Sequence, residues 1–401
     1  MRLRAPLLST LTVALTAISF MVLGPAAVSH GAGAPPRTAP AHSCATAKAG
    51  FAACKAIVRT DIVAAKPLAA GATPSGYGPS SLRSAYTLPS ATAGSGRTVA
   101  IVDAYNDPTA EADLGVYRSR YGLRACTTAG GCFKKIDQNG GTSYPAADGG
   151  WSQEISLDLD MVSAICPNCH ILLVEAKTAS FADLGAAVNR AAKTAGVVAI
   201  SNSYGGSDAS DATYGAYYHH PGIAVTASSG DNGYGASYPA SSHYVTAVGG
   251  TTLSPASNSR GWTETAWSRA GSGCSANNTA LSAAASFGTG CTRRAEADVS
   301  AVADPSTGVA VYDSTAYQGR SGWLVFGGTS VSSPVIASVY ALAGNTASID
   351  NNYPYRHASS LNDVTSGSNG LCLLAPTQWC HARTGWDGPT GLGTPHGTGA
   401  F

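Results

Sequence analysis

The sequence has few charged residues and no block of charge of either sign. Only 12% of the 401 residues are Asp, Glu, Lys or Arg, and the formal net charge is +1. A typical globular protein has about 25% charged residues. A protein that binds nucleic acid or an anionic membrane surface needs a concentrated basic patch. We therefore expect no nucleic-acid partner.

Long hydrophobic runs are also lacking after the N-terminus, which argues against further membrane-spanning helices. Residues 1–23 begin with two arginines and continue as an apolar run, and small residues follow. This order is typical of a secretory signal peptide, although an uncleaved membrane anchor begins in a similar way. We predict a signal peptide over residues 1–34. The mature protein is then secreted and extracellular, with no stable membrane association after cleavage.

Cysteine, in contrast, is plentiful. The ten cysteines form five neighbouring couples: Cys44 and Cys54, Cys126 and Cys132, Cys166 and Cys169, Cys274 and Cys291, and Cys372 and Cys380. An even number of closely spaced cysteines in an exported chain predicts local disulfides. Cys166-Pro-Asn-Cys169 also matches a redox motif, but no thioredoxin-like pattern surrounds it. A zinc site is disfavoured because no second cysteine or histidine pair completes it.

Strand and helix patterns alternate along the chain after residue 76. Apolar, β-branched runs predict strands at residues 98–103, 170–175, 197–201, 223–227 and 244–248. Helical patterns cover residues 108–121, 152–165, 181–195 and 330–342, and Ser152 is a candidate N-cap. This alternation predicts an α/β fold with a mostly parallel β-sheet flanked by helices. Residues 35–76 are rich in Ala, Pro, Gly and Ser and are predicted to be a short propeptide or linker.

A serine stands at the start of the last predicted helix. Ser330 follows Gly327-Gly328-Thr329 and precedes an apolar run. This order places its hydroxyl where backbone N–H groups and the positive end of the helix dipole converge. A nucleophile that attacks a carbonyl needs such donors for the developing oxyanion. A serine that merely caps a helix has the same local pattern, so other residues must decide.

Three acidic residues are candidate partners for this serine. Glu154 and Asp158 are four residues apart on a predicted helix, so they project from nearly the same face. In a cleft the pair would share a proton, and Glu154 could act as general base toward Ser330. Asp231 follows a buried strand in a glycine-rich turn, where a protonated carboxyl could donate to an oxyanion. The plain alternatives are a solvated helix face for the pair and an ordinary turn for Asp231.

Together these motifs resemble the sedolisin family of serine-carboxyl peptidases. Glu154-x-x-x-Asp158, Ser-Gly-Asp231-x-Gly and Gly-Thr-Ser330-x-x-x-Pro occur in the family's order along the chain. The resemblance covers residues 77–401 and implies a subtilisin-like fold. It implies Ser330 as nucleophile, Glu154 as base, Asp158 as its orienter and Asp231 as oxyanion donor.

The same resemblance explains two further features. None of the histidines that precede Ser330 lies in a His-Gly-Thr setting, where a subtilisin-type enzyme keeps its base; the one His-Gly-Thr run, at His396, follows the serine. Asp103 resembles the subtilisin triad aspartate in position, but in sedolisins that role passes to the helix pair, so Asp103 is taken as structural. Sedolisins usually carry a long folded prodomain, whereas only residues 35–76 separate the predicted signal peptide from the predicted peptidase domain.

A C-terminal loop resembles the calcium loop of the same family. Asp363 and Asp387 would supply carboxylates to one structural Ca²⁺, and Val364 and Gly385 would supply backbone carbonyls. Arg383 stands where the family often has a further glycine, and its carbonyl is an additional candidate ligand. Two unrelated loop aspartates are the alternative interpretation.

The sequence therefore predicts a secreted, monomeric endopeptidase that acts on protein or peptide substrates through an acyl-enzyme. Acidic pH is expected because Glu154 must be ionised while Asp231 stays protonated. One alternative is a catalytically silent secreted binding protein on the same scaffold. A glycosidase that uses Glu154 and Asp158 is another, but carboxylates on adjacent helical turns are hard to place on opposite sides of a sugar.

Overall fold

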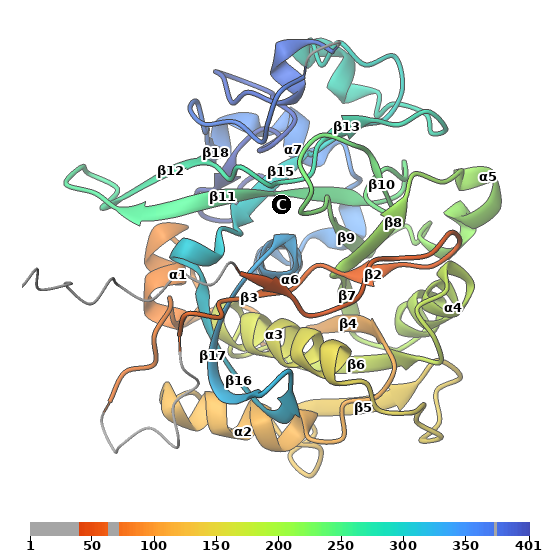
Figure 1. Ribbon diagram of the computed structural model, residues 1–401, viewed down its shortest axis with the longest axis vertical. Helices are drawn as coiled ribbons and strands as arrows, with labels where there is room; N and C mark the ends of the chain where they lie inside the picture. The colour runs from red at the N-terminus through yellow and green to blue at the C-terminus, as the bar shows by residue number, and fades with distance from the viewer. Residues whose placement is uncertain (1–39, 63–71, 373–374) are drawn as a thin grey trace, which may run out of the picture. The chain divides into compact units, whose positions relative to one another are not determined.

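A mostly parallel β-sheet runs through the structure (Figure 1). The computed structural model describes residues 40–62, 72–372 and 375–401, so the predicted signal peptide lies outside the described residues. Seven strands follow one another in the order β12-β11-β9-β7-β4-β6-β5, and β15 pairs with β11 as the eighth. Among these strands, only the pairing of β12 with β11 is antiparallel. The strands are β4 (Thr98–Ala104), β5 (Phe133–Asp137), β6 (His170–Ala176), β7 (Val197–Asn202), β9 (Ala224–Ser228), β11 (Thr246–Pro255), β12 (Trp262–Ala266) and β15 (Val299–Val302).

Helices cover both faces of this sheet. α3 (Gly149–Ile165) and α6 (Thr329–Ala343) pack against each other and against one face, and α4 (Phe181–Ala192) packs against the other. Alternation along β4 separates the two faces, because Val99 joins the core with α3 and α6 whereas Ala100 joins the core with α4. Burial on both faces explains why the strands are continuous apolar runs in the sequence.

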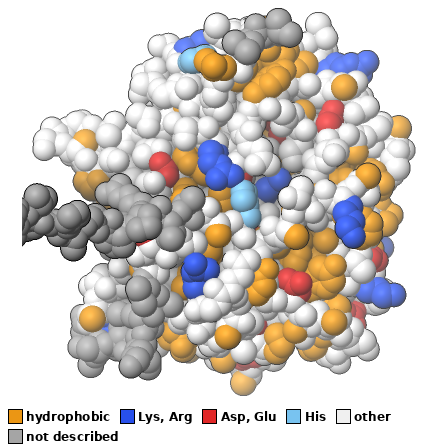
Figure 2. All heavy atoms as spheres, viewed as in Figure 1, with side chains coloured by type: hydrophobic (Ala, Val, Ile, Leu, Met, Phe, Trp, Pro, Cys, Tyr) orange, Lys and Arg blue, Asp and Glu red, His pale blue; other side chains and the backbone are white. Residues whose placement is uncertain are grey.

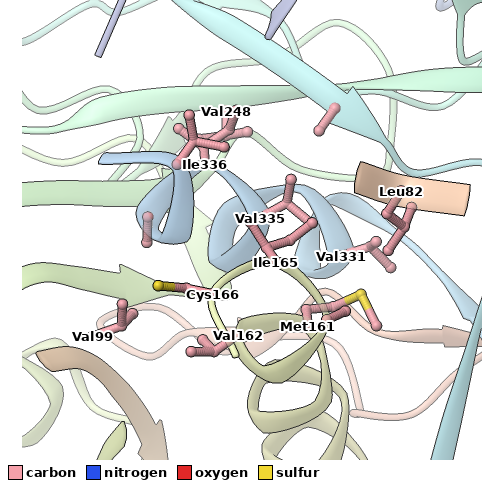
Figure 3. Packing of buried hydrophobic residues seen from close by; sticks show 14 of the residues in the cluster. Leu82, Val99, Met161, Val162, Ile165, Cys166, Val248, Val331, Val335 and Ile336 are labelled. Atoms are coloured by element: carbon pink, nitrogen blue, oxygen red, sulfur yellow. The ribbon is translucent and has the colours of Figure 1, made fainter. Parts of the chain in front are cut away.

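The contact between α3 and α6 is apolar. Figure 3 shows Ile165 of α3 beside Val335 of α6 and Met161 of α3 on the side of Val331, and all four side chains are buried. Each such side chain stabilises the fold by about 1.5–3 kcal/mol when it is fully buried. The two helices that carry Glu154 and Ser330 are therefore fixed relative to each other by packing.

The predicted α/β architecture is confirmed, and every predicted strand and helix has a counterpart shifted by a few residues. The predicted cap of α3 is wrong. The side chain of Asp148 caps this helix by accepting hydrogen bonds from the N–H groups of Gly150 and Trp151, each at 3.0 Å. Ser152 already lies inside the helix. The helix begins with two glycines, which are poor helix formers and hid its true start in the sequence.

The sequence analysis did not predict a β-hairpin that leads into α6. Its strands are β16 (Val309–Tyr317) and β17 (Arg320–Gly327), and they pair antiparallel. The connecting Gln318 and Gly319 both have positive φ, at 47° and 74°, as a two-residue hairpin turn requires. β17 ends immediately before the turn that precedes Ser330, so the hairpin positions the start of α6.

The described residues 40–62 pack within the same unit as the sheet. They contain β1 (Ala41–His42), β2 (Ala53–Cys54) and β3 (Ile57–Val58), drawn in red in Figure 1. β2 pairs antiparallel with β8 (Tyr204–Ser207), and β3 pairs antiparallel with β17. The N-terminal segment thus extends two sheets of the main body, and its assignment as a propeptide or linker stays a prediction.

All five predicted disulfides are confirmed. The bonds join Cys44 to Cys54, Cys126 to Cys132, Cys166 to Cys169, Cys274 to Cys291 and Cys372 to Cys380. On the face seen in Figure 2, acidic and basic side chains are few and scattered. Within the described residues, no helix has both the length and the apolar character that crossing a bilayer requires.

Candidate active site

The turn between β17 and α6 places Ser330 in the first turn of a buried helix. Gly328 adopts a φ of 94°, which favours glycine, and the chain enters α6 at Thr329. The Ser330 side chain is fully buried, and its Oγ donates a hydrogen bond to the carbonyl of Ser203 at 3.1 Å. Because the N-cap position is held by Gly328, the alternative interpretation of Ser330 as a helix cap is wrong.

Helix α3 brings Glu154 and Asp158 to this serine, and both side chains are fully buried. The solvated helix face is therefore excluded. Both oxygens of Asp158 accept from the Ser203 hydroxyl at 2.8 Å, while Ser330 lies beside Glu154. Burial raises the pKa of Glu154 well above its ordinary value, the carboxyl of Asp103 adds to this effect, and the Ser330 hydroxyl opposes it.

Asp103 is a third buried carboxyl in this cluster. It lies near the carboxyl end of β4, and functional sites gather at the carboxyl ends of strands in open parallel sheets. This position is the one feature of the sequence that indicates a place for Asp103 in the site. Neither of its oxygens has a hydrogen-bond partner among the described residues. Burial, followed by the effects of Asp103 and Glu154, raises the pKa of Asp158 well above its ordinary value. Asp103 therefore acts electrostatically on both members of the helix pair, an effect that its interpretation as a structural residue does not include.

Asp231 faces the same turn from the other side. Its Oδ1 accepts from the N–H and the hydroxyl of Thr329, both at 2.8 Å. Its Oδ2 is buried and has no hydrogen-bond partner within the described part of the chain. A Cβ placed on Gly328 would lie 3.1 Å from that oxygen, so Oδ2 borders the turn before Ser330. Burial raises the pKa of Asp231, which favours a protonated carboxyl that can donate to an oxyanion.

The peptide bond between Lys55 and Ala56 lies among these groups. The N–H of Ala56 donates to Oε2 of Glu154 at 2.8 Å, and the N–H of Lys55 donates to the carbonyl of Ser203 at 3.1 Å. The carbonyl oxygen of Lys55 comes so close to Gly328 that a Cβ there would lie 1.8 Å from it. Residues 53–58 thus cross the site in an extended conformation. Their first part, β2, pairs with β8, and their last part, β3, pairs with β17.

The sequence does not predict that residues 53–58 cross the site, because β2 and β3 have only two residues each and show no periodic pattern.

No described histidine belongs to the group of side chains around Ser330. No hydrogen bond joins a described histidine to Ser330 or to the carboxyl cluster, and His219, for example, stacks on Tyr244. The base candidates next to Ser330 are therefore carboxyls.

The candidate calcium residues also come together. The N–H of Gly385 donates to Asp363 at 2.9 Å, and the N–H of Arg383 donates to Asp387 at 3.1 Å. Burial, with a smaller effect of Asp363, raises the pKa of Asp387 to about 7. Carboxylate and carbonyl oxygens are the hard donors that Ca²⁺ takes, and the contacts bring Asp363 and Asp387 to one loop. The described residues contain no group of three or more His, Cys, Asp or Glu side chains that could hold a metal.

Comparison with known proteins supports the same interpretation. The sequence profile of the subtilase family matches residues 127–360. Kumamolisin from Bacillus sp. (strain MN-32) is 29% identical over 368 residues, which cover 81% of this chain and 63% of kumamolisin. Sedolisin from Pseudomonas sp. (strain 101) is 27% identical over 377 residues, which cover 82% of this chain and 61% of sedolisin. The chain thus spans less than two thirds of the length of these two relatives.

Solved structures agree with the sequence relatives. Pseudomonas sedolisin, described as a serine-carboxyl proteinase in complex with two molecules of pseudo-iodotyrostatin, matches with a TM-score of 0.67 and 26% identity, covering 81% of this chain and 96% of that chain. Sphericase, with a TM-score of 0.51 and 18% identity over 80% of this chain and 98% of that chain, shares the fold. The predicted subtilisin-like fold is confirmed. The chain belongs to the subtilase family, and within it to the sedolisins.

Proposed function

We propose that this protein is a serine-carboxyl peptidase that hydrolyses peptide bonds in proteins or peptides through an acyl-enzyme. One observation carries the proposal. A peptide bond of the chain itself, Lys55–Ala56, has its nitrogen 2.8 Å from Glu154 and its carbonyl oxygen against the turn that leads to Ser330. These are the positions that the leaving nitrogen and the developing oxyanion of a substrate need.

The first half of the reaction forms the acyl-enzyme. Glu154 takes the proton of Ser330 while Oγ bonds to the carbonyl carbon, and the carbonyl π electrons move to oxygen. Protonated Asp231 and the backbone N–H groups at the start of α6 stabilise that oxyanion. Glu154 then passes its proton to the leaving nitrogen, and the C–N bond breaks. Asp158, held by Ser203, keeps the charge and orientation of Glu154.

The second half reverses these roles with water as the nucleophile. Glu154 takes a proton from water, the hydroxide oxygen bonds to the acyl carbon, and Ser330 leaves with the proton that Glu154 returns. We propose an acidic pH optimum for this cycle. Activity rises with pH as the carboxyl cluster around Glu154 loses a proton, and falls as Asp231 ionises. Burial raises the pKa of Glu154 and of Asp231. The pH at which activity rises and the pH at which it falls are therefore both higher than ordinary carboxyl pKa values.

The described residues 40–62 block the site in this state. We propose that they are part of the predicted propeptide and that the enzyme becomes active when the Lys55–Ala56 bond is cut or the segment leaves. Cys44–Cys54 closes a loop on the N-terminal side of that bond, so residues 44–55 would depart as one disulfide-closed piece. The segment would thereby restrain activity until it is released.

We further propose that the mature protein is secreted and binds one structural Ca²⁺. Five disulfides suit an oxidising compartment. Asp363, Val364, Gly385 and Asp387 would hold the ion, which would offset the like charges of the two carboxylates and stabilise the C-terminal loop.

A digest of casein and of short peptides from acid to neutral pH tests the proposed function. The variant Ser330→Ala should lose all cleavage. Ser332→Ala is a matched control, because its hydroxyl is also buried in α6 but donates to the carbonyls of Ala301 and Val302, away from the acids. Cleavage by Ser330→Ala at the wild-type rate would reject the peptidase mechanism.

A further inference from the structure

We infer that this peptidase selects lysine or arginine immediately before the cleaved bond, and that Glu296 is the residue that determines this specificity. The inference rests on the proposed peptidase function and names its substrate class. It starts from Lys55, the residue whose carbonyl lies against Gly328, because the side chain of that residue shows where a substrate's side chain would go.

The side chain of Lys55 follows a channel that glycine keeps open. A Cβ on Gly205 would lie 3.3 Å from Cε of Lys55 and 2.5 Å from Oγ of Ser237. The aliphatic stem of Lys55 therefore passes over Gly205 on the face of β8, next to Ser237 of the paired strand β10 (Ser237–Tyr238). A cavity of about 370 Å³ adjoins it and is lined in part by Gly205, Gly206 and the loop 229–237. Polar groups in its lining include the hydroxyls of Ser229 and Ser237 and the carboxyl of Asp231, and its apolar side chains are mostly alanines.

Glu296 lies behind this channel in β14 (Ala295–Glu296) and is fully buried. Its Oε1 accepts from the N–H of Ser237 at 2.7 Å. Its Oε2 is buried and has no hydrogen-bond partner in the residues that the structure describes. Ser237 thus links the two sites, since its backbone holds Glu296 while its side chain borders the stem of Lys55. An unpartnered carboxylate oxygen whose charge acts on the Lys55 ammonium is a ready acceptor for an ammonium or guanidinium group.

The charges around Lys55 agree with this assignment. Burial lowers the pKa of Lys55, and the carboxyls of Asp231, Glu296 and Glu154 act against that effect in this order. The proposed mechanism gives Asp231 and Glu154 catalytic tasks. Glu296 is the acid of this group that has no step in the reaction, and an incoming cation would compensate its buried charge.

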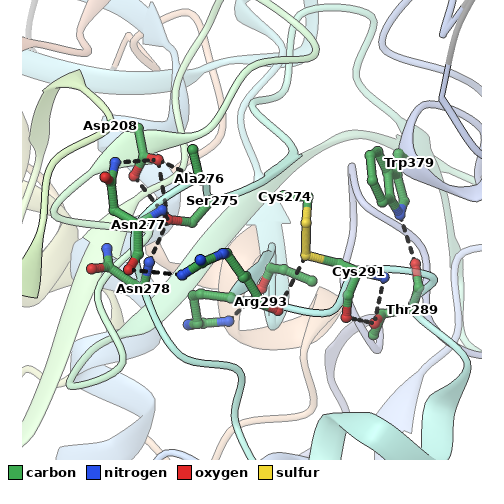
Figure 4. Close-up of a disulfide and its surroundings, with 12 residues drawn as sticks. Asp208, Cys274, Ser275, Ala276, Asn277, Asn278, Thr289, Cys291, Arg293 and Trp379 are labelled. Atoms are coloured by element: carbon green, nitrogen blue, oxygen red, sulfur yellow. Dashed lines mark hydrogen bonds between the residues drawn. A yellow bond between two sulfur atoms is a disulfide. The ribbon is translucent and has the colours of Figure 1, made fainter.

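The groups that face Glu296 from neighbouring elements do not supply that cation. The guanidinium of Arg294 is held by Asp298, with Nη2–Oδ2 at 2.5 Å and Nη1–Oδ1 at 2.8 Å. Asp208, shown in Figure 4, accepts from Ser275, Ala276 and Asn277 and adds negative charge. Burial raises the pKa of Glu296, the N–H of Ser237 and the charge of Arg294 lower it, and Asp208 raises it by a smaller amount.

A purely structural role for Glu296 makes a different prediction. If the side chain serves only to accept from the N–H of Ser237, then Glu296→Gln retains that acceptor and changes nothing in substrate choice. If its charge selects a basic residue, the same variant loses the selection. The two roles are therefore separated by substrate preference and not by stability.

The experiment compares two quenched-fluorescence peptides with the sequence of residues 50–60 and serine in place of Cys54. One has lysine and the other norleucine at the position of Lys55, so they differ in charge but hardly in length. The full-length wild-type protein, after its own segment has been released in acid, should cut the lysine peptide with at least about tenfold higher kcat/KM. Glu296→Gln should bring the ratio of the two kcat/KM values close to one.

Asp313→Asn is the matched control. Asp313 is also a buried acid with one oxygen held by a backbone N–H, from Thr315, and the other unpartnered among the described residues, but it lies on β16 outside the channel. It should leave the ratio unchanged. Because each ratio is measured within one preparation, loss of folded enzyme cancels. Gly205→Ala provides a second variant, and its added methyl should lower the ratio by narrowing the channel.

The outcomes separate this inference from the proposed function. Equal cleavage of both peptides by the wild type, or an unchanged lysine preference in Glu296→Gln, would overturn the assignment of Glu296. Absence of cleavage of either peptide, or equal cleavage by Ser330→Ala, would instead reject the peptidase function on which the inference rests.

Discussion

Asp298 and the acids near Ser330 differ in how many of their buried oxygens have hydrogen-bond partners. Asp298 accepts from Arg294 and Tyr355 through Oδ1, and from Arg294 and the N–H of Ala247 through Oδ2. In the cleft, by contrast, both oxygens of Asp103 and one oxygen each of Glu154, Asp231 and Glu296 have no hydrogen-bond partner in the described residues.

Acids whose oxygens are all hydrogen-bonded stabilise the fold, whereas acids with an unused oxygen can take part in a reaction. A fully bonded buried ion pair contributes structure, and breaking it leaves an uncompensated charge. A buried carboxyl with an unused oxygen destabilises the fold when it is ionised, and a group of such carboxyls marks a candidate functional site, whereas the single unused oxygen of Asp313 stands apart on β16. Glu154 accepts from the nitrogen of the Lys55–Ala56 bond, and Asp231 borders the turn that its carbonyl oxygen contacts, where a reaction needs a base and an oxyanion donor.

The largest effect is expected from Glu154→Gln. Removing the general base should lower kcat/KM by about 10²–10⁴-fold. The same change removes a buried charge, so the free energy of unfolding should not fall. Peptide kinetics and urea unfolding of the same preparation check both statements. Activity within a few-fold of wild type would show that Glu154 is not the base.

The opposite pattern is expected from Asp298→Asn. The change removes the charge that compensates Arg294 and should lower the free energy of unfolding by about 3–5 kcal/mol. The remaining folded enzyme should keep its kcat, since Asp298 lies outside the cleft. Urea unfolding in a Ser330→Ala background, which prevents self-digestion, measures the stability. An unchanged urea midpoint would mean that fully hydrogen-bonded acids do not contribute more to stability than acids with an unused oxygen.

The unpartnered acids should also make stability depend on pH. The pKa values of Asp103, Glu154 and Asp158 are raised in the folded protein, so their contribution is fully present below ordinary carboxyl pKa values. It is lost as pH rises through the folded pKa values. Urea unfolding of Ser330→Ala should therefore show a free energy of unfolding that falls from about pH 4 toward neutrality. Adding Glu154→Gln should reduce that slope, and a stability that rises toward neutral pH would contradict the account.

The smallest effect concerns release of the segment that blocks the cleft. Nε2 of His42 accepts from Arg269 at 2.7 Å, and burial, Arg269 and Lys55 lower the pKa of His42. Docking of the segment is therefore favoured above pH of about 6.5, the ordinary histidine value, and weakens as pH falls below it. Limited proteolysis of residues 40–62 in Ser330→Ala should accelerate in acid. His42→Gln should reduce this acceleration, and an identical pH dependence in both proteins would exclude His42 from the release.

The sequence predicts the parts of this arrangement that depend on local patterns. The β-branched runs predict the central strands, and the spacing of Glu154 and Asp158 places them on one face of α3. The hairpin β16–β17 was missed, although Gln318-Gly319 between two apolar runs is a recognisable turn. The burial of Asp103 and Glu296 depends on segments far apart in the chain, so neighbouring residues do not indicate it.

The course of residues 53–58 through the cleft could not be predicted for the same reason. Its contacts to Ser203, Glu154 and β17 span long stretches of the chain, and the segment itself offers only the Cys44–Cys54 pair as a local signal. Substrate preference likewise depends on a channel formed by β8, β10 and β14. Motifs predicted the reacting groups, whereas the placement of a substrate-like strand required the structure.

The N-terminus of the full-length protein after acidification tests the central claim most directly. Intact mass and N-terminal sequencing should show a new terminus at Ala56 in the wild type. The chains with Ser330→Ala and Glu154→Gln should stay uncut at that bond. A wild-type protein that is never cut between Lys55 and Ala56, or a Ser330→Ala protein that is cut there by itself at the same rate, would contradict the account.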